Sequence, residues 1–304
     1  MKKADPSRPP AAKQFSILRA LFALALGPGR PGLFFLLLVG LFVGAWYVAW
    51  RFYAGPHVLA DPRYRITADD VEITPPPPWI HSDVRGEAIR GITLRGSMSV
   101  MDDKLTQRIA DAFGLHPWVA KVVGVRKFHP SRVKVDLEYR RPVLMVEVPV
   151  PGGVGLLPVD VQGAWLPSGD FSPIEANGYP RLAGITSAPV GPMGTRWGDA
   201  RVLGAAEIAA AIGPAWAALG LQRITAAVAS VTNAGEEYTY EIATRHGRRI
   251  LWGHSPGESN PGEVAAAEKV ARLKQYAADH GDLDSPLGPQ ALDVRGLRRL
   301  EVKP

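Results

Sequence analysis

The longest apolar stretch of the chain runs from Leu33 to Trp50, eighteen residues without a charged side chain. A helix of this length reaches about 27 Å, close to the roughly 30 Å hydrocarbon core of a bilayer. Arg30 and Arg51 flank it, and aromatic residues gather at its far end, where amphipathic rings favour the membrane–water interface. The pattern predicts a transmembrane helix over residues 33–53, and the alternative is a buried core helix.

Basic residues lie mainly before this span. Residues 1–32 carry six Lys or Arg side chains and one acidic residue, Asp5, whereas the twenty residues after the span carry three basic side chains. Because Lys and Arg are retained on the cytoplasmic side, the asymmetry predicts a cytoplasmic segment 1–32. A linker over 54–64 then leads to domains in a bacterial periplasm.

A second apolar run, Phe15–Leu26, precedes the span and is too short to cross a bilayer. It is typical of a helix that lies in the membrane interface. The alternative is the core of a signal peptide, with Ala23-Leu24-Ala25 as a small-residue cleavage site.

Beyond the linker, the spacing of apolar residues predicts a strand over 65–74, which the proline run Pro75–Pro78 ends. A short helix over 82–92 follows, and a second helix, capped by Asp102 or Asp103, ends at Gly114. Apolar residues then predict a strand over 119–125, and strict alternation predicts a half-buried strand over 133–139. The expected order is strand, helix, helix, strand, strand, with extended chain continuing over 143–148.

The second half of the chain reads as mostly β with two helices. Asp199 is placed to cap an alanine-rich helix, and the sequence Asn-Pro-Gly-Glu at 260–263 predicts the start of another. Alternating residues around Tyr240 and a turn at His246-Gly247 predict a β-hairpin. With a final strand over 291–295, the whole chain is predicted to be α+β.

Composition narrows the functions that this chain is expected to have. The net charge is +6, but basic residues outside the N-terminus are scattered among acidic ones, which does not favour nucleic-acid binding. The chain has no cysteine, so disulfides, thiol catalysis and cysteine-ligated metals are excluded. The seven histidines show no ligand spacing, and no glycine-rich phosphate loop is present. We therefore expect no metal, no cofactor and no small-molecule substrate.

One motif suggests an enzyme. Residues 253–257, Gly-His-Ser-Pro-Gly, match the G-x-S-x-G pattern of a hydrolase nucleophile elbow, with Ser255 as the nucleophile. The residue after that serine must supply a backbone N–H to the oxyanion hole, and Pro256 has none. The expectation is that the chain is not an enzyme, with a periplasmic hydrolase as a lesser alternative.

Several motifs, in order, resemble one family. His-Pro-Trp-Val at 116–119, Val-Arg-Lys-Phe-His-Pro at 125–130 and the strand that ends in Glu-Tyr-Arg-Arg-Pro-Val at 138–143 are similar to the POTRA domain of the bacterial cell-division proteins FtsQ and DivIB. Tyr-Pro-Arg-Leu-Ala-Gly at 179–184 and Ala-Leu-Asp-Val-Arg at 291–295 resemble segments of the β domain of that family.

The resemblance implies a POTRA domain over 65–147 and an FtsQ-type β domain over 148–304. It implies a non-catalytic scaffold of the divisome at the division septum, which links ring assembly to septal wall synthesis. FtsB-like and FtsL-like membrane proteins are the implied partners. An export or assembly module that carries a POTRA domain is the alternative.

Partner binding in such a scaffold is expected to occur by strand addition, because the edge strand of a sheet has unpaired N–H and C=O groups. The resemblance places the site on the closing strand, which is taken as a sheet edge. The rival interpretation is that this strand is covered. The family often has tyrosine at the position of Gly296. The candidate partner-binding residues are Leu292, Asp293, Val294, Arg295, Gly296 and Leu297.

Overall fold

A computed structural model describes residues 31–54, 64–93, 98–232, 235–258, 260–281, 283–285, 290–296 and 301–303. The chain forms two compact units, Met1–Arg65 and Ile66–Pro304, and each is treated by itself. Most of the predicted cytoplasmic segment, the apolar run 15–26, most of the linker 54–64 and Leu297 lie outside the described residues.

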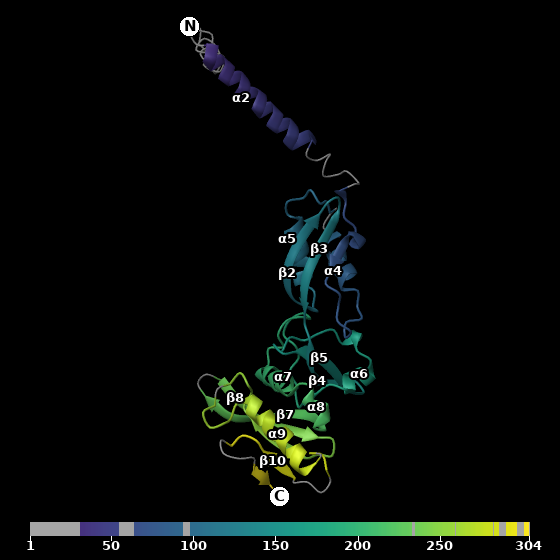
Figure 1. Ribbon diagram of the computed structural model, residues 1–304, viewed down its shortest axis with the longest axis vertical. Helices are drawn as coiled ribbons and strands as arrows, with labels where there is room; N and C mark the ends of the chain where they lie inside the picture. Colours follow the sequence, from purple (N-terminus) through teal and green to yellow (C-terminus); the bar gives the residue numbers. More distant parts are fainter. Residues whose placement is uncertain are drawn as a thin grey trace, which may run out of the picture. The chain divides into compact units, whose positions relative to one another are not determined.

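Among its described residues, the first unit contains one long apolar helix, α2, from Pro31 to Ala49, followed by a π-helical turn, Trp50–Ala54 (Figure 1). Proline suits the first helical position because its missing N–H has no partner there in any helix, and α2 accordingly begins two residues before Leu33. Segment Phe34–Phe52 is long and apolar enough to cross a membrane. None of the residues in this segment is buried, whereas the core helix of a soluble protein is mostly buried.

The second unit begins with a three-stranded sheet and two helices, in the predicted order of strand, helix, helix, strand, strand. Strand β3 lies in the centre, parallel to β1 and antiparallel to β2. Both helices pack on one face of this sheet. The elements are β1 (Val71–Ile73), α4 (Val84–Thr93), α5 (Leu105–Gly114), β2 (Val119–Phe128) and β3 (Arg132–Tyr139).

The predicted alternation in β3 is confirmed, because Val133, Val135 and Leu137 are buried. They pack in one apolar cluster with the buried face of α5, which includes Ile109 and Phe113. The same cluster contains Leu166, from a loop between the later strands.

Two details of this region differ from the sequence prediction. The first strand has three residues, because the carboxylate of Asp70 accepts hydrogen bonds from the Thr67 N–H (2.9 Å) and hydroxyl (2.8 Å) and closes a 3-10 turn before it. Helix α5 is not capped by an aspartate: Lys104 is the N-cap residue. The side chain of Asp102 instead accepts the Lys104 N–H at 2.9 Å, within the preceding turn.

An eight-stranded mixed sheet follows, in the order β11-β10-β9-β8-β7-β6-β4-β5. Pairs β4/β6, β6/β7 and β9/β10 are parallel and the other neighbours are antiparallel. Its strands are β4 (Pro142–Val150), β5 (Gly153–Asp160), β6 (Arg181–Ala183), β7 (Leu221–Thr232), β8 (Gly235–Thr244), β9 (Arg249–Gly253), β10 (Ala291–Asp293) and β11 (Glu301–Lys303).

Helices α7 (Ala200–Ile212) and α9 (Ala266–His280) share an apolar core with this sheet. Short helices α6 (Pro173–Asn177) and α8 (Ala215–Ala218) complete the domain (Figure 1). Asp199 caps α7 as predicted, since its side chain accepts the Arg201 N–H at 2.9 Å. The chain is therefore α+β, as its sequence predicted.

The chain passes from the first sheet to the second between β3 and β4, which is earlier than the expected boundary after Glu147. Strand β3 ends at Tyr139, and β4, which begins at Pro142, pairs with β5 and β6 of the larger sheet. The intervening Arg140 forms a largely buried ion pair with Asp160 of β5, 2.6 Å between Nη1 and Oδ2. Extended chain continues across the passage, so periodicity alone gives no sign of the change of sheet.

The predicted helix start at 260–263 is wrong, because α9 begins at Ala266. Asn260 does accept the Gly262 N–H, at 3.0 Å, but the turn stops there. The carboxylate of Glu263 is bonded to His254 and Lys269 and does not return to the backbone as a helix cap.

Candidate functional site

The predicted partner-binding residues lie at the C-terminal strands, but β10 is not a free edge. It pairs in parallel with β9 and antiparallel with β11, so both sides of its backbone ladder are occupied. Leu292, Asp293 and Val294 are buried, and the Val294 N–H donates to the Leu251 carbonyl at 3.3 Å. The expectation that this strand is a sheet edge is therefore wrong, and the rival interpretation, that it is covered, is confirmed, because the short strand β11 pairs with its outer side.

Two of the predicted residues form a local pair. The carboxylate of Asp293 accepts both Nε and Nη2 of Arg295, at 2.8 and 2.6 Å, and also the Arg295 backbone N–H at 3.1 Å. This bidentate contact holds the guanidinium in a fixed direction. The hydrogen bonds that Arg295 donates to Asp293 raise the pKa of its guanidinium further above its usual value.

A shallow hollow of about 320 Å³ opens beside this pair. One wall of the hollow is the loop before α9, and the other is the end of β10 with the residues after it. A backbone hydrogen bond joins the two walls, since the Val264 N–H donates to the Arg295 carbonyl at 3.2 Å. Arg272 of α9 donates to the carbonyl of Gly296. The lining residues are Asn260, Gly262, Glu263, Asp293, Arg295 and Gly296.

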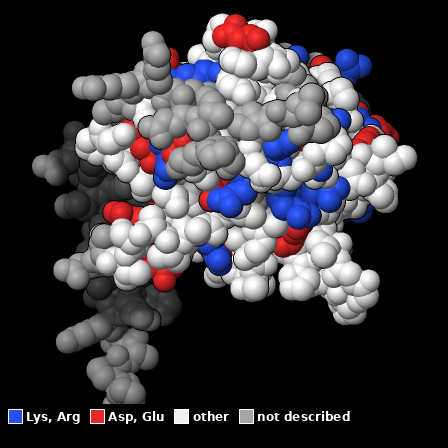
Figure 2. Space-filling view, turned by 90° about the horizontal axis from the view of Figure 1, so that it is seen from below, with Lys and Arg blue, Asp and Glu red and all other residues white. Residues whose placement is uncertain are grey.

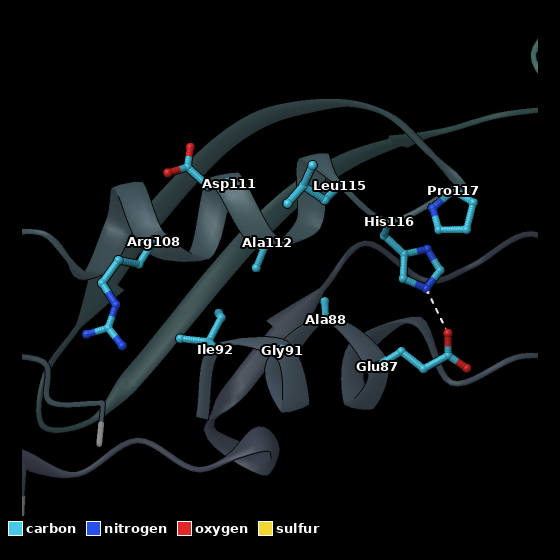
Figure 3. Close-up of a pocket in the computed structure, with 10 residues that line it drawn as sticks. All are labelled: Glu87, Ala88, Gly91, Ile92, Arg108, Asp111, Ala112, Leu115, His116 and Pro117. Atoms are coloured by element: carbon cyan, nitrogen blue, oxygen red, sulfur yellow. Dashed lines mark hydrogen bonds and ion pairs between the residues drawn. The ribbon is translucent and has the colours of Figure 1, made fainter. Parts of the chain in front are cut away.

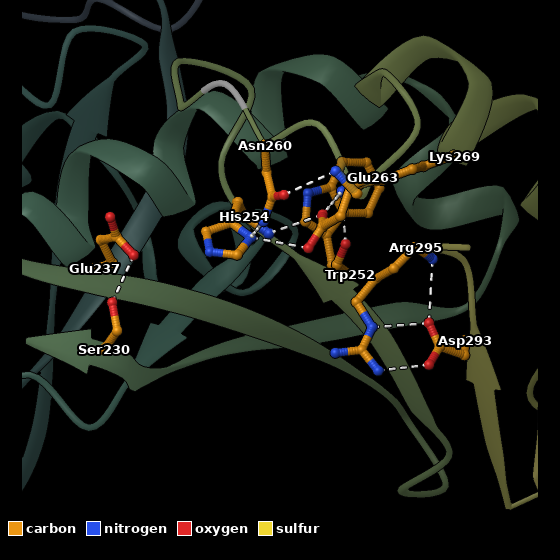
Figure 4. A network of polar contacts seen from close by, with 10 residues as sticks. Ser230, Glu237, Trp252, His254, Asn260, Glu263, Lys269, Asp293 and Arg295 are labelled. Carbon is orange, nitrogen blue, oxygen red and sulfur yellow. Dashed lines mark hydrogen bonds and ion pairs between the residues drawn. The ribbon is translucent and has the colours of Figure 1, made fainter. Parts of the chain in front are cut away.

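A polar network that sequence reasoning did not identify adjoins the hollow, because Glu263 belongs to both (Figure 4). The carboxylate of Glu263 contacts Nδ1 of His254 at 2.8 Å and accepts Nζ of Lys269 at 2.5 Å. Lys269 is 3% exposed; its ammonium also donates to the Trp252 carbonyl at 2.7 Å and lies 5.2 Å from the centroid of that ring. The sequence did contain a signal for a buried lysine. Lys269 is three residues after Ala266 and four before Leu273, which puts it on the buried face of α9.

Burial of Glu263 disfavours its charged form, but hydrogen bonds from Lys269 and His254 outweigh that effect and lower its pKa. The carboxylate is therefore ionised at neutral pH and pairs with the ammonium of Lys269. The network ties the loop after β9 to the first turns of α9. Its chemical role is to hold the walls of the hollow in place.

Ser255 lies next to this network and is 5% exposed. Residues 256–257 form a turn, and α9 begins only at Ala266. A nucleophile elbow places its serine on a sharp turn from a strand straight into a helix, with the hydroxyl exposed. That geometry is not formed at Ser255.

A second hollow, of about 370 Å³, lies between α4 and α5 (Figure 3). Apolar side chains such as Ile92 and Leu115 line it together with the pair His116 and Glu87, whose Nε2 and Oε2 are 3.2 Å apart. Burial lowers the pKa of His116 in spite of the nearby carboxylate. The imidazole is therefore neutral at pH 7, and its hydrogen bond with Glu87 joins α4 to the segment that follows α5.

Charged side chains of both signs lie next to one another on the face shown in Figure 2. On the larger sheet, the ion pairs Arg249–Glu241, at 3.0 Å, and Arg223–Glu147, at 3.1 Å, join opposite charges. In the part of the chain that the structure describes, no three His, Asp or Glu side chains converge as metal ligands would.

Comparison of the sequence with protein-family models and with curated proteins gives no match in either set.

Proposed function

We propose that the chain is a single-pass scaffold of the bacterial divisome that links cytoplasmic ring assembly to septal wall synthesis through periplasmic protein–protein contacts. The N-terminal segment is cytoplasmic, α2 spans the inner membrane, and the second unit is periplasmic. Its first sheet with α4 and α5 is a POTRA domain, and its larger sheet is the FtsQ-type β domain.

One observation carries the proposal: an apolar helix precedes a β-α-α-β-β unit whose last strand is central, and this unit continues directly into a second sheet. This is the order of parts that the motifs at 116–143 imply by resemblance. The excess of Lys and Arg before α2 supports the orientation. The paired backbone of β10 and the bidentate contact of Asp293 with Arg295 give this end of the sheet a fixed geometry, which suits recognition.

The proposed partners are FtsB-like and FtsL-like membrane proteins. Because β10 is covered, we place strand addition on the outermost strand at that end of the sheet, β11. Asp293, Arg295 and Gly296 then line the hollow next to the docking edge, and the buried Leu292 and Val294 support that edge from within. A partner strand would extend the sheet by main-chain hydrogen bonds, and the Asp293–Arg295 pair would present charge beside it.

The experiment that tests this role is recovery of FtsB-like and FtsL-like proteins with the tagged full-length chain from detergent-solubilised membranes. We expect Val302→Pro, which removes a backbone N–H from β11, to reduce recovery, and Val302→Ala, which keeps it, to leave recovery unchanged. Equal recovery with both variants would contradict strand addition at β11.

Two further measurements test location. A fluorescent protein fused to the N-terminus should gather at midcell, and protease added to spheroplasts should digest the second unit. A protected second unit, or fluorescence spread evenly around the cell, would exclude the proposed role.

A further inference from the structure

We propose that the opposite end of the larger sheet carries a second docking site, in which an extended, uncharged peptide segment of a partner protein adds to the edge of β5. This site is far along the sheet from β11, since β5 and β11 are its two outermost strands. The inference does not depend on the proposed divisome role.

The first step is the direction of the backbone groups of β5. At its C-terminal end, the carbonyl of Pro158 accepts the Leu166 N–H at 2.8 Å, and the Asp160 N–H donates to the Ala164 carbonyl at 3.0 Å. Residues 158 and 160 therefore direct their backbone groups away from β4. Because backbone direction alternates along a strand, Val154 and Leu156 do the same.

The second step is that these groups are unpaired. No hydrogen bond joins the backbone of Val154 or Leu156 to any described residue on that side, whereas loop 164–166 covers the edge from Pro158 onward. The free edge thus spans Gly153 to Leu157. On this edge, the side chain of Val154 is 65% exposed. An exposed apolar residue on an unpaired edge strand favours pairing with another chain.

The third step is the groove beside this edge. Val154, Leu156 and Pro158 turn their side chains to the same face, where they form one wall of a groove of about 350 Å³. The other wall comes from α6 and the segment before it. None of the lining residues is charged; they are Met145, Val154, Leu156, Pro158, Ser168, Phe171, Pro173, Ala176 and Asn177.

The edge and the groove together define the occupant. A strand added to β5 takes hydrogen bonds from Val154 and Leu156, and the residues opposite them direct their side chains into the groove. A neutral groove admits uncharged side chains at those alternate positions, because a charged side chain would lose water without gaining a partner. The partner segment is therefore extended, with aliphatic residues at every second position.

The test uses a fluorescein-labelled peptide, Lys-Thr-Val-Thr-Val-Thr-Val-Thr-Lys, and the full-length protein in detergent, with binding followed by fluorescence anisotropy. We expect saturable binding that is lost when the three valines are replaced by glutamate or are N-methylated. Hydrogen exchange should slow at the amides of Val154 and Leu156. Absence of saturable binding, or equal binding of the N-methylated peptide, would overturn the proposal.

The edge variant is Val154→Pro, matched by Val154→Thr, which keeps the N–H and the side-chain shape. A proline at this position should fold, because Pro158 already occupies an equivalent position of the same strand. One lost hydrogen bond corresponds to roughly a three- to tenfold weaker affinity for Val154→Pro. The threonine variant should bind within about twofold of the parent protein, and equal affinities for the two variants would contradict strand addition.

The groove variant is Ser168→Lys, which places a charge among the apolar lining residues without touching the backbone of β5. It should weaken binding of the valine peptide, and a Ser168→Thr control should not. A second copy of the chain is the competing occupant. If the peptide does not bind, and the protein instead self-associates with rising concentration in a way that Val154→Pro abolishes, the occupant of the edge is a second copy of the chain and the proposed partner segment is wrong.

Discussion

The indole Nε1 of Trp118 donates to Oδ2 of Asp170 at 2.5 Å, and both residues are buried. Trp118 leads into β2 of the first sheet, whereas Asp170 lies between β5 and α6 of the second. The same carboxylate accepts the Ser82 hydroxyl at 2.9 Å, and Nδ1 of His81 lies 2.8 Å from the Asp170 carbonyl oxygen. One aspartate therefore joins the first sheet, the segment before α4 and the second sheet.

The proline run takes part in the same junction. Thr74 still pairs with β3, through its N–H and the Val135 carbonyl at 3.1 Å. After Pro75–Pro78, the indole of Trp79 donates to the Arg140 carbonyl at 3.1 Å. Consecutive prolines have restricted backbone angles, so the run acts as a stiff connection between β1 and the passage between the sheets.

Replacement of Trp118 by phenylalanine should destabilise the protein by about 1–3 kcal/mol, because a buried carboxylate loses a donor. Denaturation of the full-length protein in detergent, followed by circular dichroism, measures the change. Trp165→Phe is the matched control, since that indole donates to the Gly191 carbonyl of a surface loop, and it should cost less than about 1 kcal/mol. If Trp118→Phe is no more harmful in the parent than in an Asp170→Ala background, the two residues are not coupled.

Acidification should weaken the fold through His116. Its pKa is lowered by burial from 6.5, so the unfolded chain binds a proton more readily than the folded chain. The contribution of neutral His116 to the unfolding free energy is complete above pH 6.5 and is lost as the pH falls through the folded-state pKa. We expect His116→Gln to reduce the loss of unfolding free energy between pH 7.5 and about 5.

Glu87→Gln provides a test of opposite sign for the same pair. The carboxylate of Glu87 raises the pKa of His116, against the effect of burial. Its removal should lower that pKa further and make the acid-induced loss of stability larger. A loss of the same size in the parent and in both variants would show that this histidine does not control the pH dependence.

Lys269→Met should destabilise the protein by about 3 kcal/mol, because it leaves the largely buried carboxylate of Glu263 without its cation. The double variant Lys269→Met with Glu263→Gln should recover part of the loss. Arg249→Met is the control for an exposed ion pair, with Glu241, and should cost less than about 1 kcal/mol. Chemical denaturation at pH 7 measures the unfolding free energy of Lys269→Met, of the double variant and of Arg249→Met. Equal losses for Lys269→Met and Arg249→Met would contradict a structural role for the network.

Gly204→Ala should be destabilising although alanine favours helices. An added Cβ in α7 would lie 2.1 Å from the hydroxyl of Tyr240 and 3.0 Å from Cβ of Ser255, and both neighbours are buried. In α4, Gly91 has no atom within 4 Å of the same position, so Gly91→Ala should raise stability by up to about 1 kcal/mol. Thermal unfolding of the two variants should therefore shift in opposite directions, and shifts of the same sign would refute the close contact of α7 with β8.

Local patterns were enough for most elements of this chain. The uncharged run after Arg30 predicted α2, alternation predicted β3, and Asp199 predicted the start of α7, because each signal depends on residues near one another in sequence. The same local reasoning misplaced the start of α9. There, Glu263 bonds to Lys269 and His254, and these longer-range contacts override the capping pattern.

What only the tertiary structure decided is which strands lie side by side. The sequence predicted the strand over 291–295 but left open whether it is an edge or is covered, and only the structure shows that β11 covers it and that β5 forms the other edge. Nor did it show that Asp170 would accept the indole of Trp118, fifty-two residues away. Strand pairing and buried hydrogen bonds depend on groups brought together by folding, so neither the edges that offer docking sites nor the junction between the sheets has a local signature.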